Sequence, residues 1–178
     1  EATLWSTNNV HRIRIYACNS VNEFEWLGKK IMIVDSFPFS KDFEALEIRL
    51  AELGEIVDKF IISQSKYTHS GNQKPIYLKQ NDPIIHKYSN KIILTTGMTK
   101  IITRNPRIRE MLQRELITRE LSKLNLTSKS IIIHSDCDEI PKAEILEQLS
   151  HRESNVNCLL ELRNYSNHLN LANGIWAR

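Results

Sequence analysis

The sequence predicts an α/β fold with a mainly parallel central sheet and flanking helices. Its first half opens with the order strand, helix, strand, which is the unit from which parallel sheets are built. Further along, the isoleucines at 131–133 predict a strand buried on both faces, as strands of parallel sheets are. The 178 residues, of which 41% are hydrophobic and 25% charged, are enough for one globular domain with a sizeable core.

The opening unit begins with a strand at 29–39, and Asp35 stands at the end of its apolar core. We expect Ser40 to cap the following helix and Gly54 to end it. A second strand is expected at 56–63. The helix is predicted to have one apolar face, made of residues at helical spacing: Phe43, Leu46, Leu50 and Leu53.

A long helix dominates the second half of the chain. It is expected to begin at Asn105-Pro106, because proline suits the first helical position, and to run to about Leu124. Its predicted apolar face consists of Ile108, Met111, Leu112, Leu116, Leu121 and Leu124. After a polar loop at 64–75, the other expected elements are a short helix at 84–85, strands at 91–96, 129–135 and 157–162, and a helix at 143–149.

Residues 1–28 have the weakest pattern, with one candidate edge strand at 11–16. We expect them to form a leader or stem-like segment, and residues 29–178 to form the domain itself. The net charge of +3 comes from scattered basic residues rather than a basic stripe, so no nucleic-acid partner is expected. No apolar run reaches the ~18 residues of a transmembrane helix, so we expect no membrane segment in this chain.

An acidic cluster directly follows the isoleucine strand. Asp136, Asp138 and Glu139 stand where the strand ends, and Pro141 prevents the strand from continuing. In open α/β sheets ligands bind just beyond the carboxyl ends of the strands, and paired carboxylates there suit Mg²⁺ or Mn²⁺ completed by substrate phosphates. The alternative is that these carboxylates cap the next helix or face water. From this stretch alone, both interpretations stay open.

Six segments occur in a distinctive order along the chain. They are Asp35–Phe39, Glu44–Leu50, Glu52–Phe60, Gly71–Pro75, Glu110–Arg114 and Ser135–Pro141. In this order they resemble glycosyltransferase family 17, the family of β-1,4-mannosyl-glycoprotein 4-β-N-acetylglucosaminyltransferase. The resemblance covers about residues 29–176.

This resemblance implies a GT-A-like nucleotide-sugar-binding fold and an inverting transferase. It implies UDP-N-acetylglucosamine as donor and a mannose-containing N-glycan or related glycan as acceptor. Asp136 and Asp138 match the Asp-x-Asp of the family, so they are expected to bind Mn²⁺ or Mg²⁺, and Asp136 also the donor diphosphate. A cation there would neutralise charge that builds up on the departing diphosphate.

Four further residues are candidates for the site. Glu139 is the candidate general base that an inverting transferase needs. Arg114 could bind the donor phosphates with its fork of N–H donors, or form only a surface pair with Glu110. Asp35 could contact the nucleotide, or serve as a turn or cap residue. Gln64 stands where the family usually has glutamate, so it either substitutes as a donor contact or marks an altered, inactive chain.

Two other functions compete with the transferase. One is a non-catalytic nucleotide-sugar or glycan-binding fragment, because we expect the family to continue beyond Trp176 and therefore expect this domain to be truncated. The other is a haloacid-dehalogenase-like phosphatase, although its Asp-x-Asp usually follows an early strand and here three candidate strands come first. For the compartment, the resemblance implies the Golgi lumen or membrane for a eukaryotic chain and the cytoplasm otherwise.

Overall fold

A computed structural model of the chain was analysed. It describes in full residues 31–68, 70–97, 103 and 105–151, and the backbone of four strands that lie outside this part. The chain divides into two compact units, residues 30–150 and a unit made of residues 1–29 and 151–178. Each unit is described by itself.

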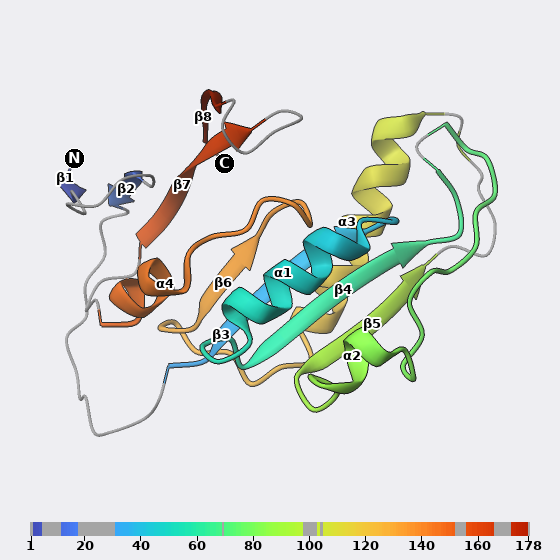
Figure 1. Ribbon diagram of the computed structural model, residues 1–178, viewed down its shortest axis with the longest axis horizontal. Coiled ribbons are helices and arrows are strands. Elements are labelled where there is room, and N and C mark those ends of the chain that lie inside the picture. Colours follow the sequence, from blue (N-terminus) through green and yellow to red (C-terminus); the bar gives the residue numbers. More distant parts are fainter. Residues whose placement is uncertain are drawn as a thin grey trace. The chain divides into compact units, whose positions relative to one another are not determined.

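The unit of residues 30–150 contains a four-stranded parallel sheet of order β5-β4-β3-β6 (Figure 1). Its strands are β3 (Ile33–Phe39), β4 (Lys59–Ser65), β5 (Ile92–Gly97) and β6 (Ile131–His134). Its helices are α1 (Phe43–Leu53), α2 (Pro83–His86), α3 (Pro106–Leu121) and α4 (Ala143–Ser150). The predicted α/β fold with a parallel sheet and flanking helices is therefore confirmed.

Helices cover both faces of this sheet, and each face has its own apolar cluster (Figure 1). The larger cluster joins Phe37 of β3 to α1, α2 and α4, with Leu50 and Leu146 among its buried members. The smaller cluster joins Val34 of β3 to Ile117 of α3. Because side chains alternate along a strand, odd positions of β3 face α1 and even positions face α3.

Strand β6 differs from its prediction in position and burial. It lies at one edge of the sheet, next to β3, and Ile132 is 47% exposed while Ile133 is buried. The prediction of a strand buried on both faces is wrong, because an edge strand far from the sheet centre has less covering. β6 pairs with β3 only as far as Ser36 and His134. Pro38 of β3 lies beyond that point, so its missing N–H costs no bond to β6.

Helix α1 is amphipathic as predicted, but its N-terminal end is built differently. Its N-cap is Asp42 rather than Ser40, whose hydroxyl instead accepts a hydrogen bond from Lys74 at 2.8 Å. Gly54 ends the helix as predicted, at the C-cap position, and its backbone has right-handed helical geometry with φ of −60°. A Cβ at Gly54 would collide with the Tyr88 ring and the carbonyl of Leu50, so close packing requires glycine there.

Helix α3 starts as predicted and faces the sheet through a different stripe. The Asn105 side chain accepts the backbone N–H of Arg107, as an N-cap should. The buried side chains are Arg109, Gln113 and Ile117, whereas Ile108 and Met111 from the predicted apolar face are 39% and 60% exposed. The first half of α3 therefore buries polar groups near the ends of the strands, which an apolar pattern could not predict.

The second unit contains an antiparallel sheet of order β1-β2-β7-β8. Its strands are β1 (Ala2–Leu4), β2 (Arg12–Ala17), β7 (Val156–Tyr165) and β8 (Ala172–Ala177). The candidate strand at 11–16 is therefore present, but it lies between two others rather than at an edge. The division into a stem-like segment and a transferase domain stays a prediction. Among the described residues, no helix is long and apolar enough to cross a membrane.

Candidate functional site

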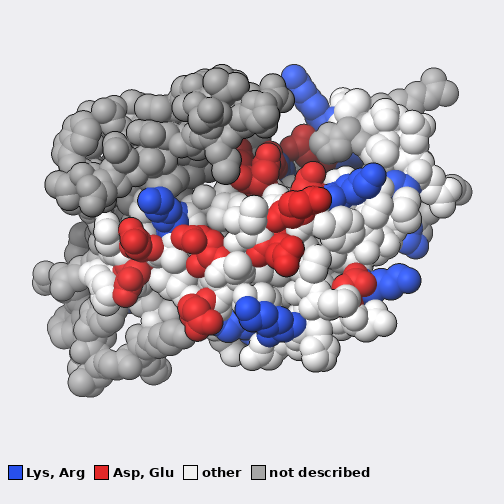
Figure 2. Space-filling model, in the orientation of Figure 1, with Lys and Arg blue, Asp and Glu red and all other residues white. Residues whose placement is uncertain are grey.

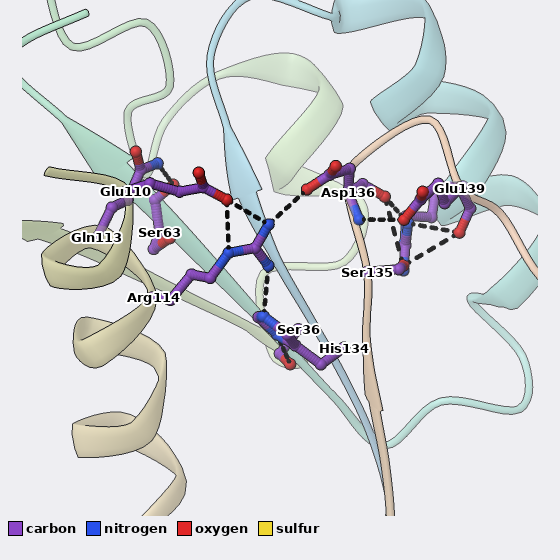
Figure 3. A network of polar contacts seen from close by, with 10 residues as sticks. Ser36, Ser63, Glu110, Gln113, Arg114, His134, Ser135, Asp136 and Glu139 are labelled. Atoms are coloured by element: carbon purple, nitrogen blue, oxygen red, sulfur yellow. Dashed lines mark hydrogen bonds and ion pairs between the residues drawn. The ribbon is translucent and has the colours of Figure 1, made fainter. Parts of the chain in front are cut away.

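The acidic loop, residues Ser135–Glu139, follows the carboxyl end of β6. It closes on itself through two backbone groups. The N–H of Asp136 donates to Glu139 Oε2 at 2.8 Å, and the N–H of Glu139 donates to the carbonyl of Asp136 at 3.1 Å (Figure 3). The Ser135 hydroxyl lies 3.1 Å from the carbonyl of Glu139, to which it can donate. These contacts give the loop a defined shape at the sheet edge where ligands of parallel α/β folds bind.

Arg114 of α3 connects this loop to the helix on one side. Its Nη2 donates to Asp136 Oδ1 at 2.8 Å and to Glu110 Oε1 at 3.1 Å (Figure 3). Its Nη1 lies 2.6 Å from Nε2 of His134, the last residue of β6. The guanidinium is about a quarter exposed, at 26%, and therefore lies at the surface of the site rather than inside the core. The site thus combines the guanidinium of Arg114 with the carboxylates of Glu110 and Asp136.

The contacts of His134 determine its tautomer. The Ser36 hydroxyl donates its one proton to the carbonyl of Ile133 at 2.7 Å, so at 3.1 Å it can only accept from His134 Nδ1. Nδ1 therefore carries the proton, and Nε2 is free to accept from Arg114. Desolvation of the ring and, next, the positive charge of Arg114 hold the pKa of His134 below its usual range. The imidazole is accordingly neutral at pH 7.

Arg49 of α1 holds the loop from the other side. Its side chain is fully buried, and its Nη1 donates to the carbonyls of Asp136, Cys137 and Glu139 at 2.7, 3.2 and 3.1 Å. Nη2 donates to the Ser135 hydroxyl at 2.7 Å. The neighbouring Cys137 is buried, and burial raises the pKa of its thiol to about 12. The backbone of the acidic loop is thus hydrogen-bonded to a buried arginine on the sheet-facing side of α1.

Asp35 is the counterion of this arginine. Its two carboxylate oxygens accept from Nε and Nη2 of Arg49, both at 2.7 Å, and neither side chain is exposed. Strand β3 continues past Asp35 to Phe39, where the predicted strand also ends, so Asp35 lies inside the strand rather than at its end. A direct contact between Asp35 and a donor nucleotide stays a prediction that this geometry does not support, since the carboxylate is enclosed and already paired.

Gln64 lies near the end of β4 and is only 2% exposed. Its amide nitrogen donates to the carbonyl of Leu78 at 3.0 Å, and its amide oxygen accepts the N–H of Leu78 at 2.9 Å. An ionised glutamate could accept here but could not donate. Glutamine is therefore the residue that fits this pair of hydrogen bonds. Its expected contact with substrate stays a prediction, and both polar atoms of its side chain are bonded to Leu78.

Comparison with protein-family models gives a match over residues 8–176, almost the whole chain, to the model described as glycosyltransferase family 17. The chain belongs to glycosyltransferase family 17. Searches of curated proteins and of solved structures found no match. The parallel sheet flanked by helices, with an acidic loop at the carboxyl ends of its strands, is consistent with the GT-A-like fold expected of a nucleotide-sugar transferase. As a glycosyltransferase, the protein acts on a sugar donor and an acceptor.

The candidate metal ligands of this family 17 chain are two carboxylates, Asp136 and Asp138. Asp136 is partly exposed and Asp138 is exposed, so both can be reached from solvent. Within the described part of the chain, no group of three or more histidine, cysteine, aspartate or glutamate side chains could hold a metal ion. The donor set therefore fits a hard cation that takes its remaining ligands from a diphosphate and water, and it does not fit a closed protein site.

The sequence missed most of what surrounds the acidic loop in this transferase. His134 is bonded to Ser36 and to Arg114, and Arg114 in turn binds Asp136. Gln113 of α3 donates to the carbonyl of Ser63 at 3.0 Å. None of these residues stands in a pattern that indicates a site. Arg49 did give a signal, because it is a charged residue beside the apolar face of an amphipathic helix, and such a residue needs a buried partner.

Proposed function

We propose that this protein is an inverting N-acetylglucosaminyltransferase, which transfers N-acetylglucosamine from UDP-N-acetylglucosamine to a mannose-containing N-glycan or related acceptor. The observation that carries the proposal is the juxtaposition at one sheet edge of the acidic loop with Arg114, in a chain of glycosyltransferase family 17. Carboxylates and a guanidinium are the groups that a metal–diphosphate leaving group needs.

Asp136 and Asp138 would hold Mn²⁺ or Mg²⁺ together with the donor diphosphate. When bound, the cation would neutralise the negative charge that the diphosphate gains as the glycosidic bond breaks. Because no group of three or more histidine, cysteine or carboxylate ligands occurs among the described residues, the cation should bind weakly to the free protein and more tightly with the donor present. Donor and cation are therefore expected to bind with positive cooperativity.

Arg114 would bind the diphosphate from the α3 side. In the structure, its charge is shared between Asp136 and Glu110, at 2.8 and 3.1 Å. A cation bound to Asp136 would compete with Arg114 for this carboxylate, and the guanidinium could then turn its fork toward a phosphate. Glu110 and the neutral imidazole of His134 would keep the guanidinium in place during this exchange.

Glu139 stays the candidate for the general base. It is partly exposed, and its Oε2 accepts the N–H of Asp136 at 2.8 Å. This bond directs Oε2 toward the backbone of its own loop, and a general base here would also have to reach the acceptor hydroxyl. The assignment of the base therefore depends on where the acceptor binds.

Calorimetry of UDP-N-acetylglucosamine binding, with and without Mn²⁺, tests the proposal. We expect Mn²⁺-dependent binding in the unchanged protein and a loss of at least about tenfold in affinity for Asp138→Ala, which removes one of two cation ligands. Asp82→Ala, at the partly exposed N-cap of α2, provides a control for removal of a carboxylate elsewhere. Equal binding by the unchanged protein and Asp138→Ala would contradict the assignment, and so would no binding under any condition.

A further inference from the structure

Arg49 is an unusual residue for the helix that contains it. Helix α1 has no other basic residue, and acidic side chains are spread over the surface that carries α1 (Figure 2). An arginine on the exposed side of α1 would be surrounded by these carboxylates. Arg49 instead points inward and is fully buried, with its guanidinium carbon 4.4 Å from the centre of the Phe37 ring. Burial of a charge is costly unless every donor is satisfied, so this position requires an explanation.

The contacts of Arg49 fall into two groups. One edge of the guanidinium donates two hydrogen bonds to the Asp35 carboxylate, from Nε and Nη2, at 2.7 Å each. The remaining donors reach the Ser135 hydroxyl and three carbonyls of the acidic loop. These carbonyls belong to a loop at the edge of the sheet and not to a helix or strand. The buried pair therefore connects the middle of β3 to the backbone from which Asp136 and Asp138 project.

We propose that Arg49, oriented by Asp35, is a positioning residue for the donor site: it fixes the backbone of the acidic loop so that Asp136 and Asp138 are preorganised for the metal–diphosphate group. This inference rests on the proposed function and explains what holds the acidic loop of the donor site in its shape. Arg49 is too enclosed to touch the donor itself. It acts by gathering carbonyls that would otherwise point in independent directions, which lowers the ordering cost when a ligand binds.

Arginine is required for this task rather than a positive charge alone. Its planar fork supplies five N–H donors in fixed directions, so it can bind a carboxylate along one edge and several carbonyls along the other. Lysine has three donors on one flexible ammonium and cannot serve both partners in this arrangement. Arg49→Lys therefore keeps the charge and removes the geometry.

The test compares Arg49→Lys with the unchanged protein by two measurements. Hydrogen–deuterium exchange reports the acidic loop in the ligand-free protein, and calorimetry reports Mn²⁺-dependent binding of UDP-N-acetylglucosamine. Leu53→Ala, which removes buried apolar contacts one turn further along α1 and no bond to the acidic loop, provides a destabilised control. Ser135→Ala removes one anchor of the loop and leaves the Asp35–Arg49 pair intact, so it continues the test if Arg49→Lys does not fold.

We expect Arg49→Lys to exchange faster at residues 136–139 and to bind the donor at least about tenfold more weakly, whereas Leu53→Ala binds it normally. Ser135→Ala should show the same changes to a smaller degree. Unchanged exchange in the loop of either folded variant, or an equal loss of affinity in Leu53→Ala, would overturn the inference. If the unchanged protein binds no donor, the proposed function fails, and the exchange measurement still decides whether Arg49 fixes the loop.

Discussion

At the scale of single residues, the candidate site depends on two arginines with different surroundings. Arg49 is fully buried and binds backbone carbonyls, whereas Arg114 is partly exposed and binds side chains. Solvent screens the Arg114 pairs, so they contribute little to folding. The same exposure makes Arg114 available to a ligand, while Arg49 is enclosed and binds both Asp35 and the acidic loop.

Arg114→Ala should separate cation binding from donor binding. The change frees Asp136 from its ion pair, so Mn²⁺ alone should bind no more weakly than before. Binding of UDP-N-acetylglucosamine in the presence of Mn²⁺ should weaken about tenfold or more, because a charge-assisted contact to phosphate is lost. Calorimetry with each ligand measures both effects.

Arg119→Ala is the matched control, because Arg119 is an exposed arginine of the same helix that pairs only loosely with Glu115, at 3.8 Å. It should leave both affinities unchanged. A parallel loss of Mn²⁺ and donor affinity in Arg114→Ala would contradict the assigned role and would indicate that Arg114 merely supports the loop.

Gln64→Glu tests the pair of hydrogen bonds between the Gln64 amide and the backbone of Leu78. The ionised carboxylate cannot donate to the Leu78 carbonyl, so the free energy of unfolding at pH 7 should fall by about 1–3 kcal/mol. Burial should raise the folded-state pKa of the new carboxyl above its unfolded value of about 4.3. The deficit should therefore be smallest below that unfolded value and appear as the pH rises through the folded-state pKa.

Urea denaturation at several pH values measures this effect. Gln80→Glu, at an exposed position, is the control and should change stability little at any pH. If Gln64→Glu is as stable as the unchanged protein at pH 7, this pair of hydrogen bonds does not explain why glutamine stands at this position.

At the scale of elements, α1 and α3 approach the acidic loop from opposite faces of the sheet. Arg49 and Asp35 lie on the α1 side, while Arg114 and Ser36 lie on the α3 side. This follows from alternation along β3, whose odd and even positions face different helices. The orientation of both helices is therefore part of the geometry of the site.

Gly54→Ala should disturb the end of α1 without touching the acidic loop. A Cβ there would collide with a backbone carbonyl and with the ring of Tyr88, so stability should fall by about 1–3 kcal/mol. Thermal unfolding measures the change, and Glu55→Ala at the exposed neighbouring position is the control. A neutral Gly54→Ala would mean that the close packing is easily relieved.

The sequence predicted the order of the elements better than their surroundings. The apolar runs gave the strands, and Asn105-Pro106 gave the start of α3, because these signals are local. The buried stripe of α3 could not be predicted, because it consists of polar side chains with backbone partners outside the helix. Gln113 donates to the carbonyl of Ser63, which is far away in the sequence, and Arg109 donates to the carbonyl of Thr103 just before the helix. The roles of Asp35 and Gln64 depend on partners 14 residues away in each case.

At the scale of the whole molecule, the residues of the candidate donor site all lie within the unit of residues 30–150. This unit contains its own parallel sheet and both apolar clusters. Asp136, Asp138, Arg114 and Arg49 all belong to this unit and not to the unit with the antiparallel sheet. We therefore expect donor binding to depend on the acidic loop and the two arginines.

The measurement that tests the central claim most directly locates the cation by nuclear magnetic resonance. Mn²⁺ broadens the signals of nearby amides, and Mg²⁺ serves as the diamagnetic reference. In the presence of UDP-N-acetylglucosamine, broadening should centre on the amides of residues 136–139 and should disappear in Asp138→Ala. Broadening centred elsewhere, or equal broadening in Asp138→Ala, would contradict the assignment of the acidic loop as the donor site.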